Sequence, residues 1–445
     1  MVVAGLNVSR RLLACGSAAV VLACGGTAAA QNMSGSSLGL PAEGMAGAGL
    51  PNMPGGFPQP GQPIERRFDV LLLGTAVYDS NVAQGGKLVQ NARGVTPADE
   101  IYTPSASINA LLPVGPGAVF VDGQIGYDFH QSNTKLQSER INMSAGGETN
   151  VGPCGGSLSG SFLRGQSDLS DLSLAVTHNI QQTISGNLGA RCTPLTGVGV
   201  YIGVSYAQTT NDSDGALVAD SHMEGVNGGV SYTNELLGLV SVNGSYNRTY
   251  YDDVLPGEAP QPSYGQVGAS ISISRQIGLR LNGEATLGIT HVLPGDAPVA
   301  PGAPVVASEP AFTGLTGSGS LVYRVNDRLS ATLIYSRAVN PSLQLGADYQ
   351  LVQTVAMTVG YTFSQRLFGS LGGTIDNRSF EGIQTTLMTT GVKSDNGYGV
   401  NAALRYTIGD KTSLSLTVDY QVRNADPAIF DYSSYRIGLT ASRSF

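Results

Sequence analysis

Histidines are the residues of this chain best suited to acid–base or metal chemistry. The sequence of 445 residues contains four of them, His130, His178, His222 and His291. A hydrolytic site needs a histidine between a serine and an orienting carboxylate, and a metal site needs several histidines to converge. Asp128 lies two residues before His130, but no spacing singles out a serine. We therefore expect no enzyme activity, metal site or cofactor, and expect these histidines to be polar residues at strand ends.

The composition points to strands that cross a membrane. The chain has 60 glycines and no tryptophan, 41% of its residues are hydrophobic, and only 13% are charged, about half the usual share. Beyond the N-terminus there is no apolar run of about 20 residues, which excludes membrane-spanning helices. A closed barrel instead alternates apolar and polar residues, which fits the mean hydropathy of +0.04. The sequence predicts an all-β protein.

The first 65 residues are expected to lie outside the barrel. Residues 1–30 resemble a signal peptide, with Arg10 and Arg11, an apolar stretch, and small residues at positions 28–30. The alternative is a lipoprotein signal that leaves a lipid on Cys24. Residues 31–65, rich in Pro and Gly, are expected to form a disordered periplasmic arm. The net charge of −8, or −8 − 2 = −10 without the two arginines, disfavours nucleic-acid binding.

From residue 66 to residue 445 the sequence predicts a transmembrane antiparallel up-and-down β-barrel. Segments of 10 to 14 residues alternate with period two, for example residues 412–424, where leucines and valines oppose serines and threonines. Tight joints, such as residues 276–278 and 409–411, interleave with long polar loops, such as residues 80–100 and 294–310. Counting gives about 18 strands, or 16 if residues 151–187 are divided differently. An even number places both termini in the periplasm of an outer-membrane protein.

The last strand carries a second signature of this class. It alternates and ends on an aromatic residue, and it is similar to the C-terminal signal that outer-membrane proteins present to the barrel-assembly machinery. The matching positions are Tyr435, Ile437, Leu439 and Phe445. The alternative is an amphipathic strand that happens to end in phenylalanine. Other aromatic residues gather at predicted strand ends, as expected where a barrel meets lipid headgroups.

The polar face of the predicted strands should line the lumen. Its charges have mixed sign, which argues against a strongly ion-selective pore and favours neutral, hydroxyl-rich solutes such as saccharides. Aromatic residues that would form a sugar-binding track are not expected on this face. The candidate lumen-lining residues are Asp122, Gln124, Asp128, Asn243, Asn247, Arg280, Asn282, Glu284, Arg324, Arg405, Asp419, Gln421 and Arg423.

Two cysteines remain once the signal peptide is removed. Cys154 and Cys192 both fall in predicted turns on the periplasmic side, in a compartment that favours disulfides. Because neighbouring turns lie close around the rim, the two cysteines are candidates for a disulfide. Two free thiols are the alternative.

The end of the first strand resembles the opening of the putative β-barrel porin 2 family. The similarity rests on Tyr78-Asp79-Ser80-Asn81-Val82 and on residues 99–106. Asp79 and Asn81 also suit an ordinary turn at the start of a loop, where such side chains bond their own backbone. Members of that family often accompany exopolysaccharide gene clusters, so the resemblance implies a link to saccharide export.

These observations predict a porin-like channel for diffusion or export of polar solutes, among them saccharides. The alternative is a non-conducting structural or docking barrel of an envelope or polysaccharide-secretion assembly, and an outer-membrane enzyme ranks third. The expected partners are outer-membrane lipid and lipopolysaccharide, the barrel-assembly machinery and a periplasmic polysaccharide-export component.

Overall fold

Eighteen strands form one antiparallel sheet that closes on itself. The computed structural model describes residues 65–167, 178–192, 197–213, 220–252, 263–294, 312–342, 349–381 and 392–445, so nearly all of the expected signal peptide and arm lies outside the described residues. The predicted count of about eighteen is confirmed. The strands are β1 (Arg67–Asp79), β2 (Asp99–Val114), β3 (Gly117–His130), β4 (Ser138–Val151), β5 (Cys154–Gln166), β6 (Asn179–Cys192), β7 (Gly197–Ser213), β8 (Ser221–Asn234), β9 (Gly238–Tyr251), β10 (Tyr264–Ile277), β11 (Leu281–Pro294), β12 (Thr313–Arg324), β13 (Leu329–Pro341), β14 (Tyr349–Thr362), β15 (Leu367–Glu381), β16 (Ser394–Ile408), β17 (Thr412–Asp426) and β18 (Tyr432–Ser444).

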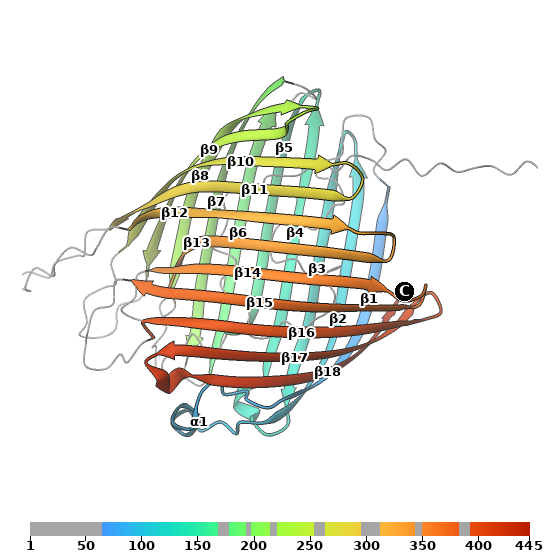
Figure 1. Cartoon of the computed structure of the whole chain (residues 1–445), viewed down its shortest axis with the longest axis vertical. Helices are drawn as coiled ribbons and strands as arrows, with labels where there is room; N and C mark the ends of the chain where they lie inside the picture. The colour runs from blue at the N-terminus through green and yellow to red at the C-terminus, as the bar shows by residue number, and fades with distance from the viewer. Residues whose placement is uncertain are drawn as a thin grey trace, which may run out of the picture.

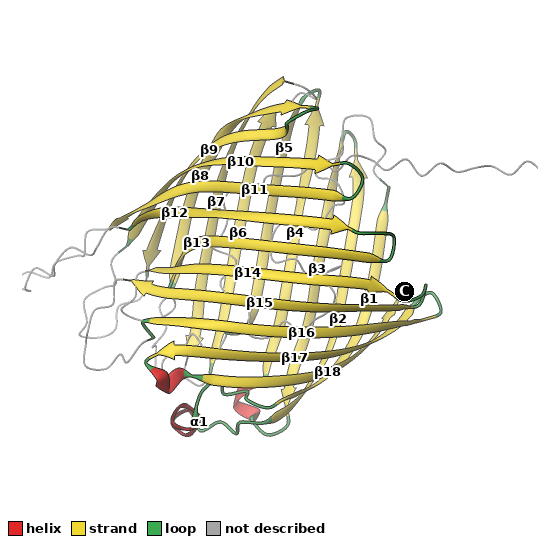
Figure 2. Cartoon of the chain, viewed as in Figure 1, coloured by secondary structure: helices red, strands yellow, loops and turns green. Residues whose placement is uncertain are grey.

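Each strand pairs with its neighbours in the sequence, and β1 pairs with β18 to close the barrel. The near strands β10 to β17 cross the far strands at a steep angle in Figure 1, as expected for strands tilted against a barrel axis. Three short helices complete the described chain: α1 (Lys87–Arg93) and the 3₁₀ turns η2 (Thr134–Leu136) and η4 (Ala428–Phe430). Both α1 and η4 lie beyond the same end of the barrel (Figure 2). No helix in the described ranges is long and apolar enough to cross a membrane.

The two ends of the barrel differ in the length of their connections. At one end, here the turn end, two to four residues join consecutive strands, and Gly115, Gly152, Gly278 and Gly409 adopt φ values of 57° to 64° there. That left-handed conformation is strained for other residues, which explains glycine at these tight turns. The other end, here the loop end, has longer connections, as the sequence predicted. Because the strand number is even, β1 begins and β18 finishes at the turn end (Figure 1).

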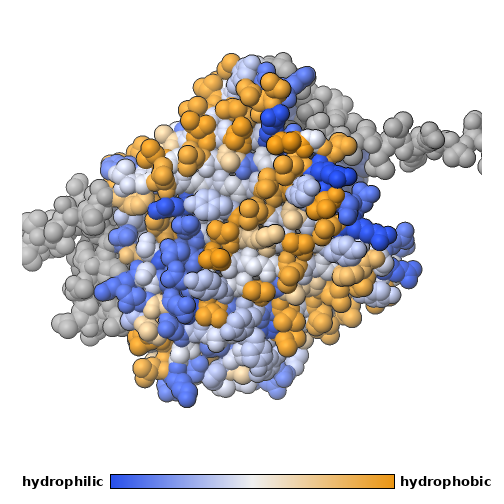
Figure 3. Space-filling view, viewed as in Figure 1, coloured by the Kyte–Doolittle hydropathy of each residue, from blue (hydrophilic) through white to orange (hydrophobic). Residues whose placement is uncertain are grey.

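The outer face of the barrel is apolar between two bands of aromatic side chains. Its large hydrophobic residues are widely exposed, including Leu287 at 66% and Ile271 at 59%. Figure 3 shows hydrophobic residues spread over the near wall, with hydrophilic residues gathered toward the ends of the strands. Near the loop end the exposed aromatic residues include Tyr78, Tyr102, Phe129, Tyr206, Tyr246, Tyr398, Tyr420 and Tyr435, and near the turn end Phe68, Tyr232, Tyr323, Tyr361, Phe363, Tyr406 and Phe445. This arrangement suits a lipid bilayer.

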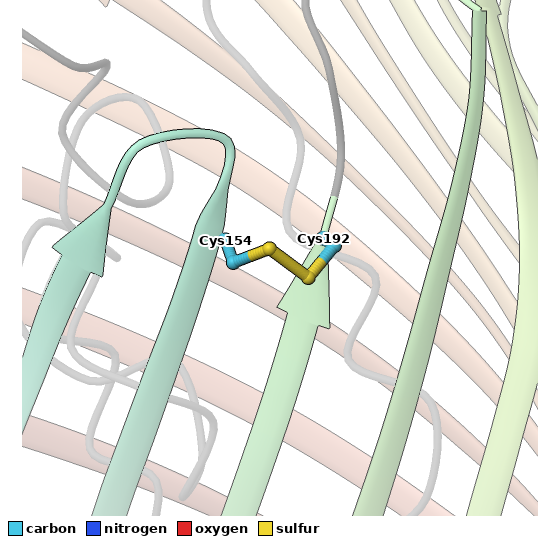
Figure 4. The surroundings of a disulfide bond; sticks show 2 residues. All are labelled: Cys154 and Cys192. Carbon is cyan, nitrogen blue, oxygen red and sulfur yellow. A yellow bond between two sulfur atoms is a disulfide. The ribbon is translucent and has the colours of Figure 1, made fainter.

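A disulfide joins two strand ends at the turn end. Cys154 opens β5 and Cys192 closes β6, and the two residues are directly opposite each other in the ladder. Figure 4 shows the bond running between the two strands beside the hairpin turn. Cys154 also lies opposite Val151, which is 74% exposed on the outer face. The bond therefore ties the β5–β6 pair at the point where the ladder would otherwise fray.

Replacing both cysteines by serine should lower the stability of the barrel. The bond closes a segment with a sequence separation of 38 residues, and its loss frees the unfolded chain, at a cost of about 2–4 kcal/mol in the free energy of unfolding. Urea unfolding in lipid vesicles checks this. Reducing the unsubstituted protein should produce the same loss, and reduction should leave the double variant unchanged; a double variant as stable as the oxidised protein would contradict the prediction.

Candidate functional site

The inner wall of the barrel is the candidate site, and the strand register identifies it. In β17, Leu416, Val418 and Tyr420 are 44% to 51% exposed on the outer face, whereas the intervening Ser415 and Thr417 are at most 4% exposed. Directly paired residues share a face, so the ladder carries this assignment from strand to strand around the whole sheet. The inner wall is therefore the face opposite the exposed hydrophobic residues.

The predicted lumen residues fall on this inner wall with one exception. Arg280 lies in the turn before β11, where its carbonyl oxygen accepts a hydrogen bond from the Arg324 backbone N–H at 2.7 Å. The alternation predicted a strand from residue 279, but β11 starts two residues later, at Leu281, so Arg280 is at the rim. The register places the others on the inner face: Asp122, Gln124 and Asp128 on β3, Asn243 and Asn247 on β9, Asn282 and Glu284 on β11, Arg324 on β12, Arg405 on β16, and Asp419, Gln421 and Arg423 on β17.

Charged side chains of the inner wall gather on eight consecutive strands, β15 to β18 and β1 to β4. We call this sector the charged arc. Its carboxylates outnumber its arginines. The carboxylates are Asp69, Asp79, Asp99, Asp122, Asp128, Glu148, Asp376, Asp395 and Asp419, and the arginines are Arg67, Arg140, Arg378, Arg405, Arg423 and Arg436.

The strongest ion pairs of the charged arc lie near the loop end. The Asp395 carboxylate accepts hydrogen bonds from Arg378 Nη2 at 2.7 Å and from Arg423 Nη2 at 2.5 Å. Asp79 Oδ2 accepts a hydrogen bond from Arg436 Nε at 2.7 Å. The side chains of Asp395 and Arg423 are only 2% and 4% exposed. Charges held in this way are compensated within the wall.

A third group of polar contacts lies on β2 to β4. Asp128 accepts hydrogen bonds from Thr103 Oγ1 at 2.5 Å and from Arg140 Nη2 at 2.5 Å. Nearer the turn end, Asn109 Nδ2 donates to Asp122 Oδ2 at 2.6 Å. Many charges of the arc are thus held by neighbours across the strands, while its carboxylates still outnumber its arginines.

The remaining ten strands, β5 to β14, form a wall with few charges, which we call the neutral arc. In the described residues of these strands the inner face carries only three charged side chains, Arg191, Glu284 and Arg324, and each lies near the turn end. Serine, threonine, asparagine and glutamine supply most of the other inner-face side chains. The sequence predicted mixed charge on the inner wall but did not predict its separation into two sectors.

A hydrogen-bonded track crosses the neutral arc. Tyr201 Oη donates to Asn243 Oδ1 at 2.5 Å, although β8 lies between their strands. It can do so because Gly229 of β8 has no side chain: a Cβ there would meet the Tyr201 ring at 2.8 Å. Asn243 Nδ2 donates to Ser272 Oγ at 3.0 Å, and Thr286 continues the track. Such a surface offers donors and acceptors without net charge.

Single aromatic residues do occur on the inner face, where the sequence did not predict an aromatic sugar-binding track. Besides Tyr201, the register places Phe120 of β3 and Phe368 of β15 there, and the Arg405 guanidinium lies 5.7 Å from the Phe368 ring centre. The period-two rule could have found Tyr201, because it shares a parity with Ser205 and Asn211 in the same strand.

At the loop end, the β1–β2 connection, residues 80–98, forms a strap that includes α1. Val89 of α1 is fully buried in a cluster with Phe380 of β15, Val392, which precedes β16, and Phe430 of η4, so this side of the strap reaches the β15 edge of the charged arc. At the opposite edge, Asn133, in the β3–β4 connection, accepts from the Thr96 N–H at 2.7 Å and donates back to the Thr96 carbonyl at 3.0 Å. The strap is therefore fastened at both edges of the charged arc.

The first residues of the strap form the turn that Asp79 and Asn81 suggested. The Asn81 backbone N–H donates to Asp79 Oδ1 at 2.8 Å, which confirms the turn at the start of this loop. Asn81 Nδ2 also donates to the Ser433 carbonyl at 3.2 Å, and Arg93 Nη1, inside the strap, donates to the Ala83 carbonyl at 2.7 Å. Contacts between residues about 350 positions apart could not be read from the sequence.

A second buried cluster occupies the loop end of the neutral arc. Tyr264 of β10 and Val292 of β11 pack with Val339 and Tyr349 from the tip of the β13–β14 hairpin. The Tyr264 and Tyr349 ring centres are 5.9 Å apart, and Gln266 Nε2 donates to the Val339 carbonyl at 3.5 Å. The hairpin tip thus leans over β10 and β11, across the short strand β12.

The four histidines do not form a site together. His130 Nδ1 lies 3.0 Å from Asp99 Oδ2, while Asp128 contacts Thr103 and Arg140 instead. His222 lies on the outer face beside Asp252, His291 contacts Thr313, and His178 directly precedes β6. In the described part of the chain, no group of three or more His, Cys, Asp or Glu side chains is placed to hold a metal ion.

The C-terminal residues that match the barrel-assembly signal lie on the outer face. Tyr435, Ile437, Leu439 and Phe445 are 46% to 60% exposed there. The Phe445 backbone N–H donates to the Val70 carbonyl at 3.0 Å, which continues the β18–β1 ladder to the last residue. The strand therefore closes the barrel with its apolar side outward.

Comparison with known proteins agrees with this architecture. Residues 242–444, from β9 to β18, match the family model described as Putative beta-barrel porin 2. The resemblance to that family is confirmed for this part of the chain, although the match leaves out the motif around Tyr78 on which the resemblance was predicted. No curated protein sequence matches the chain.

Solved barrels of similar shape have little sequence in common with this chain. OccK2 (OpdF) from Pseudomonas aeruginosa is 11% identical, with 86% of this chain and 98% of that chain covered and a TM-score of 0.45. A BenF-like porin from Pseudomonas fluorescens Pf-5 is 13% identical, with 85% and 98% covered and a TM-score of 0.45. The ferric citrate transporter FecA is 11% identical with a TM-score of 0.45, and this chain spans only 61% of its length.

Proposed function

We propose that this porin-like barrel of the outer membrane is a passive channel for neutral, hydroxyl-rich solutes, with saccharides as the main class. The turn end then faces the periplasm and the loop end faces the outside, as short turns and long loops do in bacterial barrels. The neutral arc carries the proposal, because its amides and hydroxyls offer hydrogen bonds to a solute without attracting ions.

The track from Tyr201 to Thr286 supports a saccharide in particular. Tyr201 supplies an aromatic ring beside Asn243 and Ser272, a combination that suits the apolar face and the hydroxyls of a sugar. An ionic solute would gain less there, because none of the track residues Tyr201, Asn243, Ser272 and Thr286 carries a charge.

Recording the ion current through the purified protein in planar lipid bilayers tests the proposal. We expect steady ion conductance with weak ion selectivity, and we expect neutral oligosaccharides to reduce the current as they enter. Tyr201→Ala should weaken this block by about tenfold, because stacking and hydrogen bonding are both lost. Val198→Ala, on the outer face of the same strand, is the matched control. A barrel that stays closed at every voltage would overturn the channel and favour a structural or docking role in an envelope assembly.

A further inference from the structure

The strap and the charged arc cover the same sector of the barrel. The strap is held to Phe380, Val392 and Phe430 near β15 to β18 at one edge and to Asn133, between β3 and β4, at the other. The charged arc runs from β15 through β18 and β1 to β4. Figure 1 places α1 beyond the ends of β18 and β2, in the middle of this sector.

Inner-face residues of the charged arc are nearly inaccessible beside the strap. The side chains of Asp79 and Arg436 are 6% and 11% exposed, and those of Asp395 and Arg378 are 2% and 11% exposed. Ser434, which donates to Asp79 Oδ1 at 2.6 Å, is 2% exposed. Without the strap above them, ion pairs so close to the mouth of the barrel would be exposed to water.

The strap has the internal contacts of a fixed element. Its two ends are bonded to each other, with the Val82 N–H donating to the Pro97 carbonyl at 2.7 Å. Inside it, Arg93 is 2% exposed, and Gln90 Nε2 donates to the Gly85 carbonyl at 2.9 Å. These buried polar contacts, together with the cluster around Val89, fix the strap over this sector of the mouth.

We infer that the strap determines the ion discrimination of the barrel: by covering the loop end of the charged arc, it confines solutes to the neutral arc as they enter. This inference rests on the proposed channel function and adds the element that sets its selectivity. A barrel without the strap would expose a wall in which carboxylates outnumber arginines. Cations would then be favoured over anions.

Two adjacent residues of α1 give a matched pair of variants. Val89→Asp places a carboxylate in the buried cluster and should release the strap, whereas Leu88→Asp adds the same charge at a residue that is 69% exposed. A third variant replaces residues 80–98 by a short turn, which the fold permits because Asp79 and Asp99 are directly paired. Resistance of the folded band to detergent on gels confirms that each variant is folded.

In planar bilayers we expect the Val89→Asp and short-turn variants to conduct at least about twofold more than the unsubstituted protein and to shift toward cation selectivity. Leu88→Asp should leave both properties unchanged. Conductance and selectivity that stay the same in the short-turn variant would overturn the role of the strap while leaving the channel function intact.

A cysteine-labelling experiment tests whether the strap covers the charged arc, and it does not depend on ion conductance. Ser434→Cys lies under the strap and Ser245→Cys lies half-buried on the neutral arc. With a water-soluble maleimide, we expect Ser434→Cys to react at least about tenfold more slowly than Ser245→Cys. The two rates should become similar when the short turn replaces the strap. Equal labelling rates for the two cysteines in the presence of the strap would overturn the inference. Slow labelling of Ser434→Cys in the absence of the strap would also overturn it, even if the barrel conducts no ions.

Discussion

Asp395→Ala should destabilise the barrel by about 3–5 kcal/mol, because it leaves Arg378 and Arg423 buried beside each other without their shared carboxylate. The Asp395 side chain is only 2% exposed, so water cannot replace the lost hydrogen bonds. The free energy of unfolding in urea, measured in lipid vesicles, should therefore fall by this amount.

An exposed ion pair on β1 provides the control for Asp395. Asp69 contacts Arg67, and their side chains are 49% and 65% exposed, so Asp69→Ala should cost at most about 1 kcal/mol. Similar losses in both variants would mean that the Asp395 cluster is solvated. In that case, its charges would also be open to passing ions.

Ile271→Arg should destabilise the barrel by about 2–4 kcal/mol, because it places a charge on the outer face at the middle of β10. Ile271 is 59% exposed in the absence of lipid, and its side chain would meet the centre of the bilayer. Urea unfolding in phospholipid vesicles measures this loss.

The adjacent residue on the inner face is the control. Ser270 accepts a hydrogen bond from Asn243 Nδ2 at 3.3 Å, so Ser270→Arg faces the interior and should cost much less. Ser270→Arg should also raise anion preference in conductance, because it adds a positive charge to the neutral arc. If Ser270→Arg were the more damaging variant, the assignment of the two faces would be reversed.

The sequence predicted the barrel well because its signals are local. Period-two alternation identifies each strand, and tight turns around glycines such as Gly278 and Gly409 separate the strands. Even the face of Asp419 or Asn243 follows from parity alone. The start of β11 was misplaced by two residues, from Leu281 to residue 279, so Arg280 was predicted on the wall although it lies at the rim.

The sequence predicted the site less well, because the site depends on contacts between distant residues. Val89 and Phe380 belong to one cluster although 291 positions (380 − 89) separate them, and no sequence pattern predicts that they are in contact. The division of the inner wall into charged and neutral arcs emerges only when the strands are placed in order around the barrel. The partner of His130 was likewise missed, since Asp99 is close in the fold and Asp128 is close in the sequence.

The order of the strands also determines when the sheet can close into a barrel during folding. Every pair except one joins strands that are consecutive in the sequence, so hairpins can assemble one after another with short loop closures. The exception pairs β1 with β18, and until β18 arrives the growing sheet has two open edges whose backbone groups invite pairing with other chains. An incomplete chain is consequently prone to aggregate, and the 13 residues of β18 remove both open edges when they pair with β1 and β17.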